Sequence, residues 1–298
     1  MRIAILSARQ GWHTDQVCLA LAARGHEGRV LPYEALVARL GGAGPPAPAA
    51  GFAAAGEDLG GCGAVLARIV PAGSLEQIIF RVDALHALEE RGIPVVNSPR
   101  AIERTVDKLW TTALLEQAGL TVPQTVVCEH PDEAIAAFRA GGGDVIVKPL
   151  FGSMGLGMVR VTTEEMAFRV FRTLETIRGV YYIQRAIDHA GRDVRAFVVG
   201  GRVIGAIERS APGWKTNLAR GGRARATTLS PEWAELALRA ARAVGADYAG
   251  VDLLPARDGT VYVVEVNGIP GWRGLQEATS IDVAAAIVEH LLGRVTAR

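Results

Sequence analysis

Short apolar runs alternate with longer helical patterns over the first hundred residues. Arg2–Ser7 is typical of a buried strand, and the Ala- and Leu-rich segment after it stops at Gly25, as a helix does. The same periodicities predict strands at Gly28–Pro32, Ala64–Val70 and Ile93–Val96 and a helix at Leu75–Glu90. An alternation of this kind predicts a small open sheet flanked by helices.

The pattern changes near Asn97, where we expect a domain boundary. Beyond it, apolar spacing predicts a hairpin over Gly191–Arg209 and helices at Ala101–Ala118, Pro131–Ala140, Thr163–Arg178, Pro231–Val244 and Ile281–Leu292. We expect three parts, at residues 1–97, 98–183 and 184–298. Leu40–Gly60 is crowded with Gly, Ala and Pro, which predicts a loop or mobile insertion whose role stays open.

The strand with the clearest chemistry is Val261–Asn267, which is rich in β-branched residues and carries an acid and an amide. Glu265 and Asn267 are two residues apart, so they leave a strand on the same face. The preceding apolar run, Gly250–Pro255, carries Asp252, and an Asp-Gly turn joins the two runs. Carboxylate and amide oxygens suit Mg²⁺, which takes nucleotide phosphates as further ligands. The structural alternative is that Asp252 is solvated and Glu265 pairs with an arginine.

A glycine-rich stretch follows the predicted strand that ends at Lys148. Gly152, Gly155 and Gly157 allow backbone N–H groups to approach an anion closely, and Ser153 adds a hydroxyl. A strand resumes after the stretch, so it predicts a β-loop-β cover over a triphosphate. A Walker loop or a Rossmann fingerprint would instead open a helix. A flexible turn is the alternative interpretation.

Two further segments carry candidate polar groups. Val180–Gln184 predicts a strand able to offer backbone groups to a nucleobase. Ser210–Arg225 predicts a basic loop, whose functional interpretation has Lys215, Asn217 and Arg220 reaching a triphosphate and a phosphorylated intermediate; the alternative is a solvated loop. In the first part of the chain, the candidates for neutralising a substrate carboxylate are Arg68 and, less favoured because it lies in a helix, Arg81.

Composition excludes several classes of protein. The 298 residues are 49% hydrophobic and 21% charged with a formal charge of +1, so no basic field points to nucleic acid as the main partner. Cys18, Cys62 and Cys128 lack the spacing of a disulfide framework or a zinc site. With no signal-peptide layout and no apolar run of membrane-spanning length, we expect a cytoplasmic protein and no membrane partner.

The motifs also form a recognisable succession. In order they are Asp107-Lys108, Val147-Lys148-Pro149 with its glycine-rich cover, Gln184, Gly191-Arg-Asp-Val-Arg195, the run from Lys215 to Gly222, Gly250-Val-Asp252 and Glu265-Val-Asn267. This succession resembles the ATP-grasp superfamily and, within it, the RimK-like branch of amino-acid ligases. The resemblance covers roughly Ala101 to the C-terminus, and the first part resembles the α/β domain that precedes it in that branch. It implies an α/β (α+β) chain with the ATP-grasp fold: an N-terminal α/β pre-ATP-grasp domain, a small lid subdomain with a glycine-rich β-loop-β cover, and a C-terminal catalytic subdomain built on an antiparallel sheet.

The same resemblance implies an ADP-forming acid–amino-acid ligase that uses ATP and Mg²⁺ or Mn²⁺. It implies two metal ions held by Asp252, Glu265 and Asn267. The nucleotide is then expected at Lys108 and Lys148 (phosphates), Gln184, Arg185, Ala186 and Ile187 (adenine), Asp193 (ribose or phosphates), and Lys215 and Asn217 (triphosphate). We assign catalytic charge neutralisation to Arg195, Asn217 and Arg220, and we expect a homo-oligomer, a dimer or a tetramer.

Two departures from the branch concern the substrates. Arg185-Ala186 stands where relatives that modify ribosomal protein often carry Glu and an aromatic residue, and Trp272-Arg273 looks more like relatives that act on small or cofactor substrates. Loop residues expected to face the cleft, and suited to a ring and a carboxylate, are Trp12, Arg68, Trp214, Trp272 and Arg273, with Arg209 as a further candidate. For each tryptophan the alternative is a core or hinge role.

These residues lead to the hypothesis that L-glutamate, or a similar amino acid, is joined to the carboxylate of a small metabolite such as a pterin-type or other cofactor precursor. A protein C-terminus is the second acceptor considered. Two hypotheses from other classes remain: a nucleotide-binding regulatory module that forms no amide, and a nucleic-acid binder that uses residues 220–225.

Overall fold

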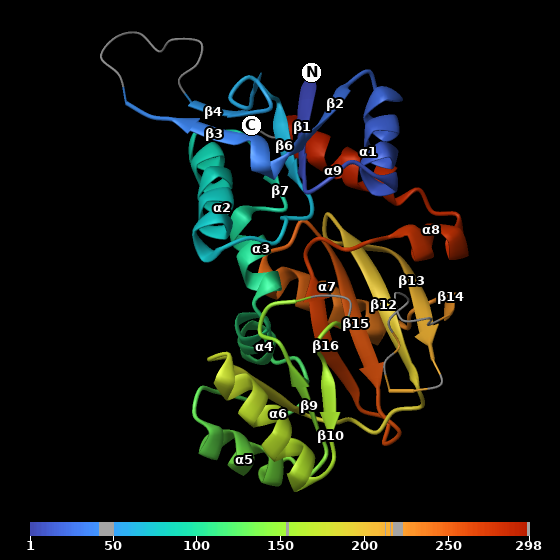
Figure 1. The fold of residues 1–298 in the computed structure, drawn as a ribbon. Coiled ribbons are helices and arrows are strands. Elements are labelled where there is room, and N and C mark those ends of the chain that lie inside the picture. Colours follow the sequence, from blue (N-terminus) through green and yellow to red (C-terminus); the bar gives the residue numbers. More distant parts are fainter. Residues whose placement is uncertain (42–50, 153–154, 212, 215, 217–222, 297–298) are drawn as a thin grey trace.

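The computed structural model describes residues 1–41, 51–152, 155–211, 213–214, 216 and 223–296. Four sheets are formed by this part of the chain. Figure 1 shows the first sheet at the top, a second sheet with β9 and β10 at the bottom, and a third with β12 to β16 on the right. Among the helices of the described residues, none combines the length and apolar character that crossing a membrane requires.

The first sheet is parallel and has the strand order β2-β1-β6-β7. Its strands are β1 Arg2–Ser7, β2 Glu27–Pro32, β6 Ala64–Ala67 and β7 Val95–Val96, with helices α1 Trp12–Ala22 and α2 Leu75–Glu90. Alternate residues of β1 point to opposite faces: Ile3 and Ile5 pack with α1, and Ala4 and Leu6 pack with α2. Both faces of the sheet are therefore buried, which is why its central strand is apolar throughout.

The end of the chain returns to this first sheet. After α8 (Arg273–Thr279), helix α9 (Val283–Thr296) packs beside α1, and its Ile287 and Val288 share one core with Ile3 and Ile5. Figure 1 shows α9, in red, next to α1, in blue. The first packing unit thus contains both ends of the described chain, and we propose that residues 283–296 be counted with the part at 1–97.

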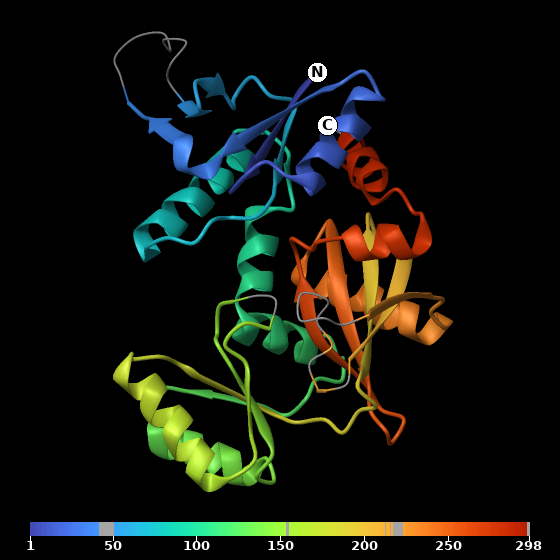
Figure 2. The ribbon, with the colours of Figure 1, turned by 45° about the vertical axis from the view of Figure 1, so that its right-hand side comes forward.

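The second sheet is antiparallel, with the order β10-β9-β11-β8. It is built from β8 Thr125–Cys128, β9 Val145–Lys148, β10 Val159–Val161 and β11 Tyr181–Arg185. Helices α5 (Pro131–Ala140) and α6 (Glu164–Thr176) pack on one face of it through the core of Val145, Val147, Tyr181 and Ile183. Figure 2 shows these helices on the outer side of the sheet, which leaves the other face turned toward the rest of the molecule. We call this unit the lid.

The third sheet is antiparallel, with the order β14-β13-β12-β15-β16. Its strands are β12 Arg192–Val199, β13 Arg202–Ser210, β14 Arg223–Thr227, β15 Tyr248–Pro255 and β16 Val261–Asn267. Helix α7 (Pro231–Val244) covers one face, ending at Gly245, whose φ of 74° is a left-handed conformation that favours glycine. The opposite face carries Asp193 and Arg195 of β12 and Asp252 of β15.

Most predicted elements are confirmed, and several ranges are met residue for residue. The predicted helices at 75–90, 131–140 and 231–244 have the bounds of α2, α5 and α7, and the β-loop-β arrangement of β9 and β10 is an antiparallel pair. The hairpin of β12 and β13 turns at Gly200-Gly201, as expected.

Four predictions were wrong in part. The helix predicted over 101–118 is broken into α3 (Pro99–Val106) and α4 (Lys108–Gln117), because Asp107 has extended dihedrals and its carboxylate accepts the Trp110 N–H at 3.1 Å as an N-cap. Within Leu40–Gly60, β4 (Gly51–Ala54) and β5 (Glu57–Asp58) pair with β3 (Leu36–Arg39), next to the short helix Tyr33–Ala35, whereas residues 42–50 lie outside the described part. The predicted loop 210–225 ends in β14, which pairs with β13.

Helix α8 was not predicted, and the terminal helix begins and ends later than expected.

The boundary residue Asn97 ties the first sheet to the third. Its side chain is fully buried; Nδ2 donates to the carbonyls of Tyr248 (2.8 Å) and Gly268, and Oδ1 accepts the N–H groups of Asp247 (2.6 Å) and Tyr248 (3.1 Å). One amide therefore satisfies backbone groups at the start of β15 and just after β16. Buried groups of this kind are costly to leave without partners.

We predict that Asn97→Ala lowers the free energy of unfolding by about 3 kcal/mol, because it leaves several buried backbone groups unsatisfied. The neighbouring Ser98→Ala removes only the N-cap bond to the Ala101 N–H and is expected to cost about 1 kcal/mol. Urea unfolding followed by circular dichroism measures both. Equal losses in the two variants would contradict the bridging role of Asn97.

Candidate active site

The lid and the third sheet each present one face to a common cleft. On the lid, β9 and β11 alternate, so that Ile146, Lys148, Tyr182 and Gln184 face away from α5 and α6 and line the cleft. On the third sheet, the cleft-lining residues include Asp193, Arg209, Asp252, Leu254 and Glu265. Period-two alternation in two sheets therefore gathers the polar side chains of six strands, β9, β11, β12, β13, β15 and β16.

A β-bulge sets the two carboxylates of the third sheet opposite each other. Asp252 of β15 pairs with Glu265 of β16, whereas the next residue, Leu253, pairs with Val263, so that one residue of β16 is extra at this point. Val263 and Val266 both pack under α7, and Glu265 lies on the cleft face. The bulge aims Glu265 at the same place as Asp252, a common function of bulges beside active sites.

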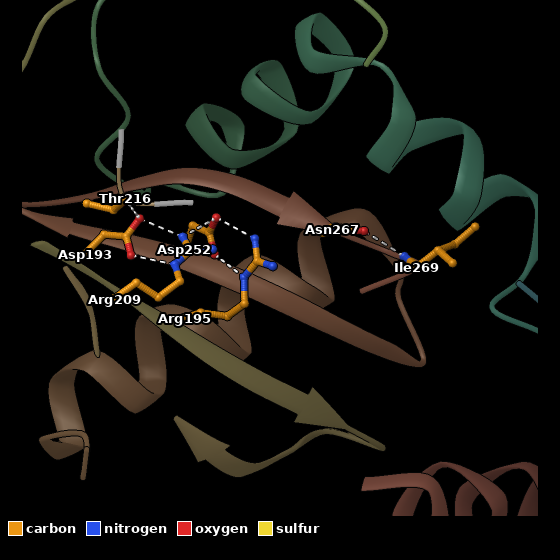
Figure 3. Close-up of polar contacts among 7 residues, drawn as sticks. All are labelled: Asp193, Arg195, Arg209, Thr216, Asp252, Asn267 and Ile269. Atoms are coloured by element: carbon orange, nitrogen blue, oxygen red, sulfur yellow. Dashed lines mark hydrogen bonds and ion pairs between the residues drawn. The ribbon is translucent and has the colours of Figure 1, made fainter. Parts of the chain in front are cut away.

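Asp252 belongs to a chain of four charged side chains (Figure 3). Its Oδ1 accepts Nε of Arg195 at 2.6 Å, and its Oδ2 accepts Nη2 of Arg195 at 2.7 Å. Arg209 Nη2 lies 2.8 Å from the same Oδ2, and Arg209 also forks onto Asp193 at 2.7 and 2.6 Å. The hydroxyl of Thr216 donates to Asp193 Oδ2 at 2.6 Å. Two arginines and two aspartates thus balance in charge.

The arginines decide the protonation of this chain. Burial by itself would raise the pKa of Asp252, but the charges and hydrogen bonds of Arg195 and Arg209 outweigh it and hold the pKa at about 2. Burial lowers the pKa of Arg209, and the more numerous contributions of Asp252 and Asp193 raise it above its usual value. Asp252 is therefore an anion at any physiological pH, and a cation that binds it displaces no proton.

The lysines of the cleft are not paired with carboxylates at ion-pair distance in the described residues. Lys148 Nζ donates to Gln184 Oε1 at 2.6 Å, and burial, with a further contribution from Lys108, lowers its pKa to about 8 although Glu265 opposes the change. Lys108 begins α4 and donates to the carbonyls of Leu150 (3.3 Å) and Gly152 (2.9 Å); burial also lowers its pKa. Two half-buried ammonium groups without an anion suit a ligand that brings negative charge.

The glycine-rich stretch connects this pair of lysines to the lid. Gly152, Gly155 and Gly157 have φ values of 146°, 66° and 71°, so the loop relies on backbone conformations that other residues rarely adopt. Gly152 and Gly155 line the cleft. Ser153 lies outside the described residues, as do Lys215, Asn217 and Arg220, so their expected roles remain predictions.

Most of the described residues expected at the nucleotide do line the cleft. They are Lys108, Lys148, Gly152, Gly155, Gln184, Arg185, Ala186, Ile187, Asp193, Asp252 and Glu265, with Trp214 from the substrate candidates. Asn267 shares the strand face of Glu265 but pairs with Gly250, and its Oδ1 accepts the Ile269 N–H at 2.9 Å. Figure 3 shows it apart from the four charged residues. The structure therefore brings two of the three expected metal ligands together and leaves the third one step along the sheet.

Several predictions about individual side chains need correction. The structural alternative for the carboxylates had the wrong partners: Asp252 is buried and pairs with arginines, whereas Glu265 has no ion pair among the described residues. Asp193 is buried and both of its carboxylate oxygens accept hydrogen bonds from Arg209, so few acceptor positions remain for the hydroxyl groups of a ribose. Arg209, a substrate candidate, is likewise a buried partner of the two aspartates.

The substrate candidates near the first sheet are also placed differently than expected. Arg68 is only 2% exposed, donates to the Tyr248 hydroxyl (3.2 Å) and the Pro270 carbonyl (3.3 Å), and lies over the Trp272 ring. Trp272 itself is buried, so both residues pack between the sheets rather than face a cleft, and the core alternative holds for this tryptophan. Trp12 is half-buried against the same core, and the exposed Arg273 pairs with Glu277. These positions are decided by packing between distant segments, which loop position in the sequence does not reveal.

Some cleft residues were missed by the sequence reasoning. Tyr182 accepts or donates a 2.7 Å hydrogen bond with Thr112 and receives a bond from Gln184 at 3.3 Å, and Arg160, His189 and Thr216 also line the cleft. Tyr182 had a usable signal, because it lies two residues from Gln184 on one strand and therefore on the same face. The others come from loops and other strands, so no local pattern marks them.

The described donors fit a divalent cation bound together with a nucleotide. Asp252 and Glu265 offer hard carboxylate oxygens, and Glu265 has no hydrogen-bond partner of its own among the described residues. No cluster of three or more His, Cys, Asp or Glu side chains suited to a metal occurs in the described part of the chain. The remaining ligands must then come from elsewhere, and phosphate oxygens are the usual supply for Mg²⁺.

Comparison with known sequences agrees with this chemistry. Residues 105–291 match the RimK-like ATP-grasp domain. The chain is 39% identical, over 76% of its length and 79% of the relative's, to a tetrahydromethanopterin:alpha-L-glutamate ligase of Methanosarcina acetivorans. It is 36% identical, over 97% of its length and 95% of the relative's, to a probable alpha-L-glutamate ligase 2 of Shewanella frigidimarina.

Solved structures give the same result for the whole fold. A RimK domain ATP-grasp protein of Sphaerobacter thermophilus has a TM-score of 0.77 at 25% identity and covers 98% of this chain and 100% of its own. The ATP-grasp ligase PsnB, complexed with a minimal precursor, Mg and ADP, has a TM-score of 0.74 at 26% identity over 99% of this chain and 98% of its own. The predicted fold class is thereby confirmed.

A buried ammonium that serves a ligand should weaken the ligand-free protein. The pKa of Lys148 is about 8 in the folded protein against an ordinary value of 10.5, so the stability penalty is fully present below pH 8 and disappears as pH rises to about 10.5. We predict that Lys148→Met raises the free energy of unfolding at pH 7 by about 1–2 kcal/mol, after allowing for the lost bond to Gln184. The gain should shrink between pH 8 and 10.5.

Urea titrations at pH 7 and pH 10 measure this effect. Arg139→Met is the control, because it removes a cation from an exposed pair with Glu164 and should leave the stability nearly unchanged at either pH. A Lys148→Met variant that is less stable than the parent at pH 7 would assign Lys148 a structural function instead.

Proposed function

The chain belongs to the RimK-like ATP-grasp family and is an ADP-forming ligase, and from this premise we propose that it joins L-glutamate to the carboxylate of a small metabolite. The observation that carries the ligase chemistry is the opposition of Asp252 and Glu265 across from Lys148 and Lys108 in one cleft. Anionic oxygens for a metal stand there beside ammonium groups for phosphates. This is the charge pattern that a nucleoside triphosphate requires.

The reaction needs charge neutralisation more than it needs a nucleophile from the protein. A carboxylate is unreactive toward amines at neutral pH, so its oxygen attacks the γ-phosphate of ATP, giving an acylphosphate and ADP. The amine then displaces phosphate and forms the amide, and its proton is released. Lys108 and Lys148 are proposed to hold the phosphates, and the glycine-rich loop of the lid to cover them and exclude water.

Two Mg²⁺ or Mn²⁺ ions are proposed, with Asp252 and Glu265 as ligands and Asn267 as the third after its side chain turns from Ile269. When bound, the metal supplies positive charge next to the transferring phosphoryl group. The adenine is proposed to lie against the segment Gln184–Ile187, where the lid sheet ends. Arg195, together with Asn217 and Arg220 outside the described residues, is proposed to neutralise the phosphorylated intermediate.

The identity of the substrates rests on the relatives rather than on the side chains first proposed to bind them. Arg68 and Trp272 are buried, so they no longer support the small-acceptor hypothesis. The relative with 39% identity is named for tetrahydromethanopterin and glutamate, which supports a pterin-type acceptor and L-glutamate as the added amino acid.

A peptide acceptor is the second candidate. The PsnB structures contain precursor peptides and share 25–26% of this sequence, less than the small-molecule ligase does. The two candidates predict different products from one enzyme preparation. A regulatory module without ligase activity, considered from the sequence, disagrees with membership among ADP-forming ligases.

We predict that Glu265→Gln lowers ADP formation by about 100-fold or more, because it removes an anionic ligand that no other described carboxylate beside Asp252 replaces. The coupled measurement of ADP release with MgATP, L-glutamate and a pterin acceptor reports it. Glu277→Gln, which alters only an exposed pair with Arg273, is the control and should keep activity within about twofold. Near-normal turnover of Glu265→Gln would reject the metal assignment.

Mass spectrometry of the products tests the substrate proposal. With MgATP, L-glutamate and tetrahydromethanopterin, we expect a glutamyl increment on the pterin and stoichiometric ADP. Addition of glutamate only to peptides, with the pterin unchanged, would select the second acceptor, and AMP in place of ADP would contradict the acylphosphate route.

A further inference from the structure

The two arginines at Asp252 are not equivalent. Arg209 has an aspartate of its own, since it forks onto Asp193 and only its Nη2 also reaches Asp252. Both hydrogen bonds of Arg195 go to Asp252, and no other carboxylate lies within ion-pair distance of it among the described residues. Arg195 is therefore bound to the site only through Asp252.

The carboxylate of Asp252 is nearly saturated by these donors. A carboxylate has about four acceptor positions, and three of those of Asp252 are used: one on Oδ1 by Arg195, and two on Oδ2 by Arg195 and Arg209. The same carboxylate is the proposed metal ligand opposite Glu265. A guanidinium forked onto both oxygens and a divalent cation on one of them would repel each other at close range in a poorly solvated place.

Burial shows which cation is able to leave. The Arg209 side chain is 3% exposed and is fixed from two sides, whereas the Arg195 side chain is 17% exposed. Moving Arg209 would leave the buried carboxylate of Asp193 without a cation, which is strongly unfavourable. Moving Arg195 leaves every aspartate with a cation once a metal has bound.

We infer that Arg195 is the exchangeable counterion of Asp252: it neutralises this carboxylate in the metal-free protein and gives way when a divalent cation binds, while Arg209 stays. The inference rests on the proposed metal site and adds to it a competition that weakens metal binding by the nucleotide-free enzyme. After the exchange the guanidinium fork of Arg195 has no anion. In the structure, Nε of Arg195 lies 3.5 Å from the position that a Cβ would take on Gly250. Among the described residues, neither Arg195 nor Gly250 belongs to those that line the nucleotide cleft. Metal loading thus prepares a fork for a carboxylate or phosphoryl group of a substrate.

The test is the affinity of the nucleotide-free protein for Mn²⁺, measured by electron paramagnetic resonance and by isothermal titration calorimetry. If Arg195 competes with the metal, Arg195→Met should bind Mn²⁺ at least about tenfold more tightly than the parent protein, a coupling of ordinary size for two cations at one site. Arg192→Met is the matched control. It removes one arginine from the same strand, and that arginine is exposed and lies 3.7 Å from Glu208, so we expect less than about a twofold change.

Each outcome is decisive. Unchanged or weaker Mn²⁺ binding by a folded Arg195→Met protein, at a site that Glu265→Gln abolishes, would overturn the exchange and leave the metal assignment standing. Mn²⁺ binding that is insensitive to Glu265→Gln in both proteins would overturn the metal assignment and the exchange together. Should Arg195→Met lose its circular dichroism spectrum, Arg195→Lys replaces it. Lysine keeps a point charge without the fork, so we expect this variant to bind Mn²⁺ more tightly than the parent protein, by less than about tenfold. An affinity for Mn²⁺ equal to the parent's or lower would overturn the exchange.

Discussion

The constraint on which the site depends is that a buried carboxylate at Asp252 must be neutralised at all times. Isolated charges are expelled from protein interiors, so Asp252 is tolerable only because Arg195 and Arg209 reach it from the neighbouring strands β12 and β13. Asp193 in turn accepts the two hydrogen bonds of the Arg209 guanidinium and balances its charge. The antiparallel order β13-β12-β15 is what sets these side chains within hydrogen-bond distance, and the bulge in β16 adds Glu265 next to them.

The cleft also depends on contacts that hold the third sheet in relation to the first sheet. Asn97 bonds to backbone groups at the start of β15 and just after β16, and α9 packs into the core of the first sheet after the chain has left the third. Arg68 and Trp272 lie in the same contact region, so they act as part of the scaffold of the segment that follows β16. Residues first interpreted as substrate ligands are thereby explained by packing.

The arrangement joins two kinds of unsatisfied charge. Lys148 and Lys108 are partly buried ammonium groups with only neutral partners at bonding distance, and Glu265 is a carboxylate with none in the described residues. A magnesium–nucleotide complex brings the opposite charge to each of them. Unpaired charges of this kind weaken a ligand-free protein, and a ligand that pairs with them would relieve the penalty, which is the ordinary relation between stability and function at a charged site.

The sequence by itself determined the elements and the chemical types at the site. Period-two and helical spacing gave the bounds of α2, α5 and α7, and the Glu-x-Asn spacing put Glu265 and Asn267 on one face, because these periodicities are local properties of the chain. The tertiary structure alone decided the partners. The pairing of Asp252 with arginines from other strands, the bulge beside Glu265 where it lies opposite Asp252, and the burial of Arg68 and Trp272 all involve residues tens to hundreds of positions apart. No local pattern encodes which of several arginines reaches a given carboxylate, since strand order, register and packing fix that distance only after the sheets have formed.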